Sequence, residues 1–151
     1  MTQLKRAFEE VKLIYRNKTP ADQRPEIQNA QSAYDILMQE WDRDQISLIE
    51  EFKTLLLDRR NRLMSIAPVS KGGMHGTVVD PKIAFMIALK RRASGMILVH
   101  NHPSGNLKPS QADITLTKRF VEAGNFLEIP VLDHLIITED GFSSIIQDLR
   151  L

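Results

Sequence analysis

The sequence predicts an α/β fold in which a central mixed β-sheet is flanked by helices. Short apolar runs of the length of strands alternate along the chain with longer segments whose apolar residues recur at helical spacing. The run GMILVH at 95–100 is continuously apolar, which is typical of a central strand that is buried on both faces. Strands that alternate with helices pack as a sheet covered by helices, and this pattern predicts the fold class.

The first part of the chain, 1–44, is expected to form an N-terminal extension with a short strand and a helix. The apolar run VKLIY at 11–15 is the candidate strand, and a polar connection with two prolines follows it. Ser32 can cap a helix that runs to about Trp41. The remaining residues, 45–151, are predicted to form the main domain.

The main domain is predicted to begin with two strands, within 50–70, around a turn at Asp58–Asn61. Asp80 and Pro81 are an N-cap and a first helical residue, so a helix is expected from there to about Ala93. The elements expected after it are a strand at 95–100, a helix at 109–126 ended by Gly124, a strand at 130–138, a turn at 139–141 and a last short strand at 142–146.

The composition is that of an ordinary globular chain, and it excludes several kinds of site. Lys and Arg number 20 against 19 Asp and Glu, so the net charge of +1 gives no support for tight non-specific DNA binding. The chain has no cysteine, which excludes disulfides, thiolate metal sites and cysteine nucleophiles. It also has no long apolar run and no signal-peptide core, so we expect a cytoplasmic protein without a membrane partner.

Two histidines at the end of the buried strand predict a metal site. His100 and His102 are two residues apart, so extended backbone projects both to the same side, with Asn101 opposite. Asp113 lies in the first turn of the next helix, which can fold back over the end of the strand. Two histidines and an aspartate leave a fourth position for water, and nitrogen and oxygen ligands suit Zn²⁺, with Fe²⁺ or Mn²⁺ as alternatives.

Each of these features also has an ordinary structural explanation. A His-x-His pair alone is a weak metal signal. Ser110 and Asp113 are spaced as a helix capping box, which is the better interpretation of that pair taken by itself. The coincidence of all these residues within one strand-to-helix junction favours the metal site.

The stretch HNHPSGNLKPSQAD resembles the JAMM, or MPN+, metalloprotease motif, in which His-x-His-Pro is followed by Ser-x-x-Asp. In detail the chain is similar to the RadC family. The similarity extends through EEFKTLLLDRRNRL before the motif and LEIPVLDHLIIT after it, over roughly residues 45–150. The helix-hairpin-helix DNA-binding segment that often precedes this domain in RadC proteins is not evident in 1–44.

This resemblance implies a cytidine-deaminase-like JAMM/MPN fold and a role for each matching residue. His100, His102 and Asp113 are expected to bind Zn²⁺. Ser110 is expected to donate a hydrogen bond to the developing oxyanion, a contribution of typically ~3 kcal/mol.

The family also uses a glutamate on an earlier strand as general base. Glu50 and Glu51 are both candidates, and the resemblance favours Glu50. Consecutive residues of an extended strand point to opposite faces, so only one of the two can face the metal.

The implied activity is that of a zinc-dependent hydrolase of the JAMM type, which cleaves an amide bond in a peptide or isopeptide substrate. Two other functions stay open. One is a nucleic-acid-associated factor in DNA repair or recombination, with nuclease activity or none, which would bind DNA or repair proteins. The other is a binding module that kept the site and lost its activity, against which the complete set of site residues argues.

Three other polar residues have predicted roles near the site. His134 lies in a predicted strand, where a buried, hydrogen-bonded histidine is favoured over a residue that supports the metal ligands. Asn101 is expected to satisfy backbone groups at the turn that follows its strand. His75, in the KGGMHG loop, is expected to be exposed and could touch substrate if that loop borders the site.

Overall fold

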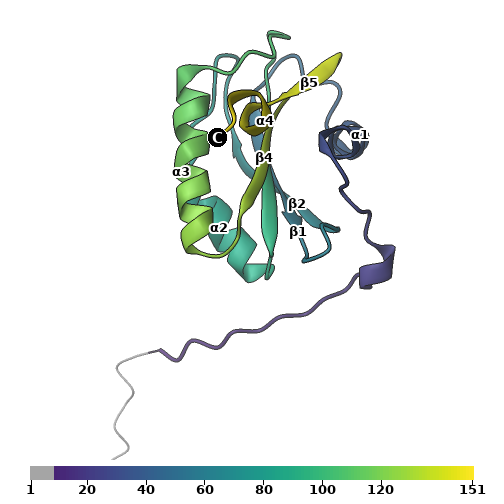
Figure 1. Ribbon diagram of the computed structural model, residues 1–151, viewed down its shortest axis with the longest axis vertical. Helices are drawn as coiled ribbons and strands as arrows, with labels where there is room; N and C mark the ends of the chain where they lie inside the picture. Colours follow the sequence, from purple (N-terminus) through teal and green to yellow (C-terminus); the bar gives the residue numbers. More distant parts are fainter. Residues whose placement is uncertain (1–8) are drawn as a thin grey trace, which may run out of the picture.

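The computed structural model describes residues 9–151 and confirms the α/β fold, with one sheet of five strands in the order β2-β1-β3-β4-β5 (Figure 1). The strands are β1 (Glu51–Leu57), β2 (Leu63–Lys71), β3 (Gly95–Asn101), β4 (Val131–Thr138) and β5 (Gly141–Ser144). The described helices are α1 (Ala30–Glu40), α2 (Pro81–Lys90), α3 (Gln111–Phe126) and α4 (Ile145–Leu149), with a 3-10 turn at Ala21–Gln23.

The sheet is mixed. β1 pairs antiparallel with both β2 and β3, and β5 pairs antiparallel with β4. β3 and β4 are parallel, so α3 connects the end of one to the start of the other across a face of the sheet. This crossover starts at the carboxyl end of β3, which is where the two motif histidines lie. Ligand sites of open α/β sheets form at such strand ends.

The helices cover both faces of the sheet. α1 lies on one face, and α2 and α3 lie on the other (Figure 1). The residues of β3 alternate between two hydrophobic clusters, with Ile97 and Val99 facing α1 and Met96 and Leu98 facing α2 and α3. His100 continues the second set, so its side chain lies under α3. The predicted buried central strand is confirmed, since all of β3 is buried.

The N-terminal prediction is corrected in two respects. Residues 11–15 form no strand, because this segment runs away from the body and pairs with no strand there, which leaves Val11 and Leu13 87% and 95% exposed (Figure 1). α1 begins at Ala30, and its N-cap is Asn29, whose side chain accepts the backbone N–H of Ser32. Ser32 is the other half of this capping box and accepts the N–H of Asn29.

The C-terminal prediction is also corrected in two respects. Gly124 does not end α3, which continues to Phe126. A Cβ at Gly124 would lie 2.6 Å from the carbonyl oxygen of Ile129, so the glycine permits a close approach between the helix and the chain that follows it. The predicted last strand stops at Ser144, whose side chain caps α4, so Ile145 is helical. No described helix has the length and apolar character needed to span a membrane.

The division of the chain at residue 44 stays a prediction. On the N-terminal side of it, α1 packs on the sheet and shares a hydrophobic cluster with β1, β3 and β4. Leu37 and Trp41 are buried in this cluster, at 1% and 4% exposure.

Candidate metal centre

Three predicted ligands meet at the junction between β3 and α3. The Nε2 atoms of His100 and His102 are 2.9 Å apart. The carboxylate of Asp113 lies 3.4 Å from the first nitrogen and 3.6 Å from the second. The strand projects both histidines to one side, and the first turn of α3 folds back over them, as the spacing of the motif predicts.

The donor set fits a metal ion. Three donors around one tetrahedral zinc lie about 3.3 Å apart, given bonds of ~2.0–2.1 Å. Here one ligand atom from each of the three residues lies within 4.8 Å of the other two, and each imidazole nitrogen has a different carboxylate oxygen of Asp113 beside it, Oδ1 for His100 and Oδ2 for His102. Within residues 9–151, His100, His102 and Asp113 form the one cluster of three or more potential metal ligands. Nitrogen and oxygen donors without sulfur suit Zn²⁺.

The hydrogen bond behind His102 directs its other nitrogen at the metal position. Its Nδ1 lies 2.6 Å from the carbonyl oxygen of Asn106, which can only accept, so Nδ1 carries the hydrogen. In the neutral ring the lone pair is therefore on Nε2.

A longer chain of hydrogen bonds does the same for His100. Thr117 donates its hydroxyl hydrogen to the carbonyl oxygen of Asp113, at 2.6 Å, so its oxygen accepts from Nδ1 of His134, also at 2.6 Å. Nε2 of His134 then has a free lone pair and accepts from Nδ1 of His100, at 2.8 Å. The Nε2 lone pair of His100 is left to face the metal position.

This chain requires a neutral His134. The residue is fully buried, and its burial, together with the neighbouring His100, holds its pKa well below the usual range. The structure thus shows the buried, hydrogen-bonded histidine that was expected, and the partner of that histidine is a candidate ligand.

Asp113 is held by the capping box that its spacing predicts. Ser110 caps α3 and accepts the N–H of Asp113, and its own hydroxyl and N–H both donate to Oδ2 of that carboxylate, at 2.7 Å. Burial alone would raise the pKa of Asp113, but its interactions with His100 and His102 in their protonated forms and the hydrogen bonds from Ser110 outweigh it and hold the pKa well below the usual range. The carboxylate is therefore ionised, as a ligand must be.

The two adjacent glutamates point to opposite faces of the sheet. Glu51 is buried and pairs with Lys53 and Lys71, at 3.3 Å each, so its charge is already compensated away from the histidines. Glu50 lines the cavity that also contains His102. The β1–β3 register leads to the same placement. It pairs Phe52 with His100, and continued by two residues it brings Glu50 opposite His102.

Asn101 fixes the backbone that carries Glu50. Its side-chain oxygen accepts the N–H of Glu51 at 2.7 Å, and its amide donates to the carbonyl oxygens of Ile46 and Ile49. The amide is fully buried and lies on the opposite side of β3 from the two histidines. The prediction that Asn101 satisfies backbone groups is confirmed, but its location is corrected, because the groups belong to the segment that leads into β1 and not to the turn after β3.

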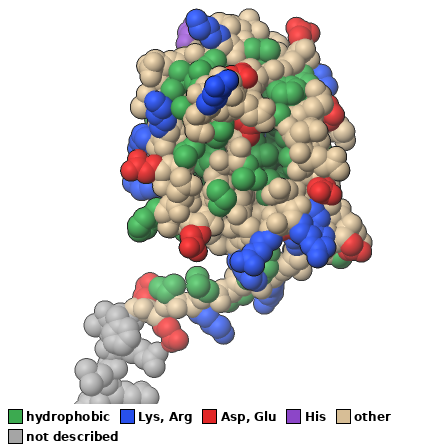
Figure 2. Space-filling model, viewed as in Figure 1, with side chains coloured by type: hydrophobic (Ala, Val, Ile, Leu, Met, Phe, Trp, Pro, Cys, Tyr) green, Lys and Arg blue, Asp and Glu red, His purple; other side chains and the backbone are tan. Residues whose placement is uncertain are grey.

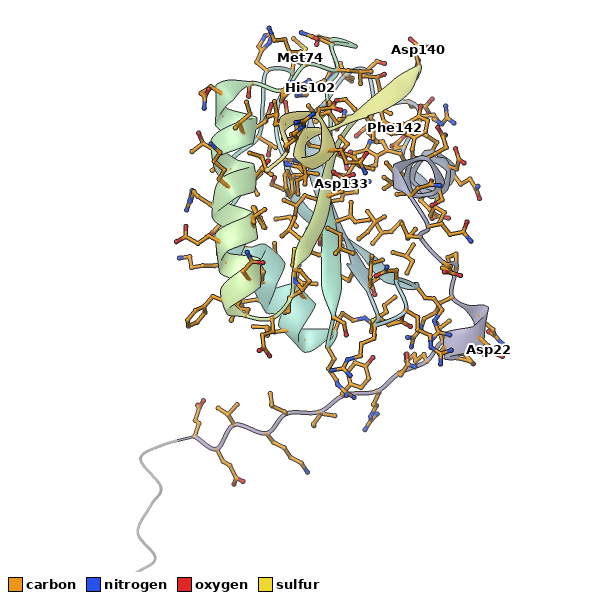
Figure 3. The ribbon with its side chains drawn as sticks, viewed as in Figure 1. Asp22, Met74, His102, Asp133, Asp140 and Phe142 are labelled. Atoms are coloured by element: carbon orange, nitrogen blue, oxygen red, sulfur yellow. The ribbon has the colours of Figure 1, made fainter. Side chains whose placement is uncertain are left out.

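A cavity of about 640 Å³ is lined by two of the three candidate ligands, His102 and Asp113. Its walls are Glu50, the loop at 74–77, the turn after β3 and the first turn of α3. Met74 of this loop lies beside His102 at one end of the molecule (Figure 3). His75 is exposed, as expected, and it lines the cavity.

The sequence reasoning missed one residue of the centre, Thr117. A threonine inside a helix is an ordinary surface or packing residue, and nothing in the motif points to it. A signal was nevertheless present, because Thr117 is four residues after Asp113 and therefore lies on the same face of α3.

Comparison with known proteins identifies the family. The RadC-like JAB domain family matches residues 27–150. Relatives named UPF0758 protein include one from Flavobacterium johnsoniae, 48% identical over 99 residues, and one from Syntrophomonas wolfei, 47% identical over 96 residues. These matches cover 66% and 64% of this chain, but only 43% and 41% of the relatives.

A relative from Desulforudis audaxviator is 39% identical over 129 residues, which is 83% of this chain and 54% of that protein. The chain therefore spans about half or less of the curated relatives it matches. The family match covers the whole sheet, the helices α1–α3 and every residue of the candidate metal centre. The chain belongs to the RadC-like JAB domain family.

Proposed function

We propose that this chain is a zinc-dependent hydrolase that cleaves an amide bond in a peptide or isopeptide. The observation that carries the proposal is the convergence of two imidazole lone pairs and an ionised carboxylate on one point, below a cavity that also presents Glu50. An open site with three protein ligands is typical of catalytic rather than structural zinc.

When bound at His100, His102 and Asp113, Zn²⁺ would supply Lewis acidity, which lowers the pKa of water towards neutrality and polarises a carbonyl. In the protein without metal, the hydrogen bond to Asp113 raises the pKa of His102, so a proton and a metal ion compete for the same nitrogen. Zinc binding is therefore expected to release a proton.

The residues of the chain supply proton transfer and charge stabilisation. Glu50 lines the same cavity as His102 and Asp113, and in this proposal it accepts a proton from the attacking water and returns it to the leaving nitrogen. The hydroxyl of Ser110 opens onto the same cavity and now donates to Asp113, so it must turn to stabilise an oxyanion.

The shape of the cavity favours an extended substrate over a small one. It is open, both polar and apolar side chains line it, and it runs between the loop at 74–77 and the turn at 102–110. A peptide or a lysine-isopeptide segment can lie in such a groove with its carbonyl over the ligands.

The matched pair Glu50→Gln and Glu51→Gln tests this proposal. Zinc-loaded protein is assayed against a panel of fluorogenic peptide and lysine-isopeptide substrates, and the zinc content of each variant is measured. We expect Glu50→Gln to lower kcat by about 10²–10⁴ while zinc binding persists, because only the proton acceptor is lost. Glu51→Gln is expected to keep its activity within about threefold, because its carboxylate pairs with lysines away from the ligands.

Two results would contradict the proposal. One is the absence of any amide hydrolysis by the zinc-loaded wild type across the panel. The other is a Glu50→Gln variant as active as the wild type, since the carboxylate would then take no part in the reaction.

A further inference from the structure

A second cavity, lined by arginines, lies at the other end of the sheet from the metal centre. It has a volume of about 420 Å³ and forms where the β1–β2 turn, the start of β3 and the N-terminal segment meet. Lys and Arg side chains gather at this end of the body, where the N-terminal segment leaves it (Figure 2). The arginines that line the cavity are Arg24, Arg59, Arg60, Arg62 and Arg92.

The single carboxylate in the lining does not balance this charge. Asp58 accepts from Arg24 at 3.2 Å and from Arg62 at 3.1 Å, and two backbone N–H groups also donate to it. Burial would raise the pKa of Asp58, but these hydrogen bonds and charges outweigh it and lower the pKa. The two arginines and the aspartate therefore leave one positive charge between them.

The other three arginines add positive charge without compensation. Arg59, Arg60 and Arg92 are exposed, and within residues 9–151 none of them has a carboxylate partner within 4.0 Å. Arg92 lies 5.1 Å from the centre of the Tyr15 ring, which forms another wall of the cavity. Like charges that converge on one hollow raise the potential there and attract an anion.

Arg24 is a buried arginine in the wall of this cavity that keeps one donor unpaired. Its side chain is only 8% exposed. Its Nε–H is also buried, yet this donor has no hydrogen-bond acceptor in the described chain. A buried guanidinium usually has all its donors paired, because an unpaired buried donor is unfavourable.

From these observations we propose that the cavity is a binding site for a phosphate group. Guanidinium groups bind phosphate through paired N–H donors, and several of them here line one hollow beside an aromatic ring. The phosphate comes either from a small phosphorylated molecule or from the backbone of a nucleic acid. The site is distinct from the metal centre, because Ser94 in its lining precedes His100 by six residues of strand, or ~20 Å.

Two probes and a matched pair of variants test this site in the full chain. Inorganic phosphate and a short single-stranded oligothymidylate are titrated into the protein by calorimetry at two salt concentrations. The test variant removes three charges at the cavity, and the control removes three charges elsewhere on the surface. The test variant is Arg59→Gln/Arg60→Gln/Arg92→Gln, and the control is Lys118→Gln/Arg119→Gln/Arg150→Gln.

We expect at least one probe to bind the wild type, and its affinity to fall about tenfold or more in the test variant and less than about twofold in the control. Binding of inorganic phosphate identifies a small phosphorylated ligand as the source. Binding of the oligonucleotide alone identifies a nucleic-acid backbone, and its salt slope should then fall by about 2 in the test variant.

Two outcomes would overturn the proposal. One is that neither probe binds the wild type. The other is that both variants lose affinity equally, since binding would then follow the overall charge and not the cavity. Thermal unfolding of both variants checks that the substitutions at the turn leave the fold intact.

Discussion

At the scale of single residues, the candidate centre depends on which nitrogen of each histidine carries a hydrogen. The Asn106 carbonyl fixes this for His102, and the Thr117–His134 pair fixes it for His100. If His134 took its other tautomer, His100 would have to carry its hydrogen on the nitrogen that faces the metal. The hydroxyl of Thr117 is therefore a positioning group for a ligand it does not touch.

Thr117→Val removes that hydroxyl and preserves the shape of the side chain. We expect zinc affinity to fall by about 10–100-fold, because groups that orient metal ligands typically contribute that much. Competition with a chromophoric chelator measures the affinity. Thr115→Val, at an exposed position of the same helix, is the control and should bind zinc as the wild type does. Equal affinity in all three proteins would show that the chain of hydrogen bonds has no influence on the ligand.

The buried carboxyl of Asp133 leads to a prediction about pH. Burial raises its pKa from 3.8, although Ser144 and the N–H of His134 donate to it. The folded chain thus holds this proton to higher pH than the unfolded chain does. Stability is expected to fall as the pH rises from about 4 through the pKa of the folded state.

Asp133→Asn keeps the accepting oxygen and removes the charge. Urea unfolding at pH 4.5 and pH 7.5 should show a wild type that loses stability relative to this variant at the higher pH. A stability difference between the two proteins that does not change with pH would mean that Asp133 does not cause the pH dependence of stability.

At the scale of elements, the connection that leads into β1 is held by one side chain from β3. Asn101 satisfies one N–H and two carbonyl groups of that connection. Asn101→Ala leaves these buried groups unpaired, so we expect a loss of about 2–4 kcal/mol in the free energy of unfolding. Chemical denaturation measures this loss. Because Glu50 lies in the same connection, kcat should fall as well, and a variant with wild-type stability and kcat would contradict the assignment.

Gly124 sets how closely α3 approaches the segment before β4. Alanine is favoured over glycine in a helix by ~1 kcal/mol, but here its Cβ would lie 2.6 Å from the backbone of Ile129. We expect Gly124→Ala to lower the free energy of unfolding by about 1–3 kcal/mol in spite of its helix propensity. A variant more stable than the wild type would show that the close approach can relax freely.

At the scale of the whole molecule, the sheet has a core on each face, and α1 closes one of them. Leu37→Ala should therefore lower the stability of the entire domain by about 2–5 kcal/mol, in a single unfolding transition. Denaturation followed by both far-UV circular dichroism and the fluorescence of Trp41 tests this. Two separate transitions would mean that α1 unfolds on its own.

The sequence predicted the main domain well, because its strands and helices have strong local signals. The buried run of β3 and the Asp80–Pro81 helix start are examples. The prediction was wrong for 11–15, where an apolar run of strand length has no neighbour to pair with, and at Gly124, where a tertiary contact requires the glycine that a helix end would also favour. Local patterns contain no information about which segments become neighbours in the fold, and both outcomes depend on that.

The same distinction applies to the candidate centre. The motif predicted that His100, His102 and Asp113 would converge, because their spacing is local and fixed by a strand and a helix turn. The partners of His100 come from α3 and β4, so only the fold brings Thr117 and His134 together. The arginine-lined cavity also joins segments that are distant in sequence. The near-neutral net charge of the chain gives no indication of it.

The most direct test is the zinc content of the purified full chain after reconstitution, measured by elemental analysis for the wild type, His102→Ala, Asp113→Ala and the control His75→Ala. His75 lines the same cavity but is not among the three converging ligands, so it separates a defined centre from adventitious histidine binding. We predict about one zinc per chain in the wild type and in His75→Ala, and loss of zinc in the other two. No zinc in the wild type, or zinc retained in His102→Ala and Asp113→Ala, would contradict a metal centre at this junction.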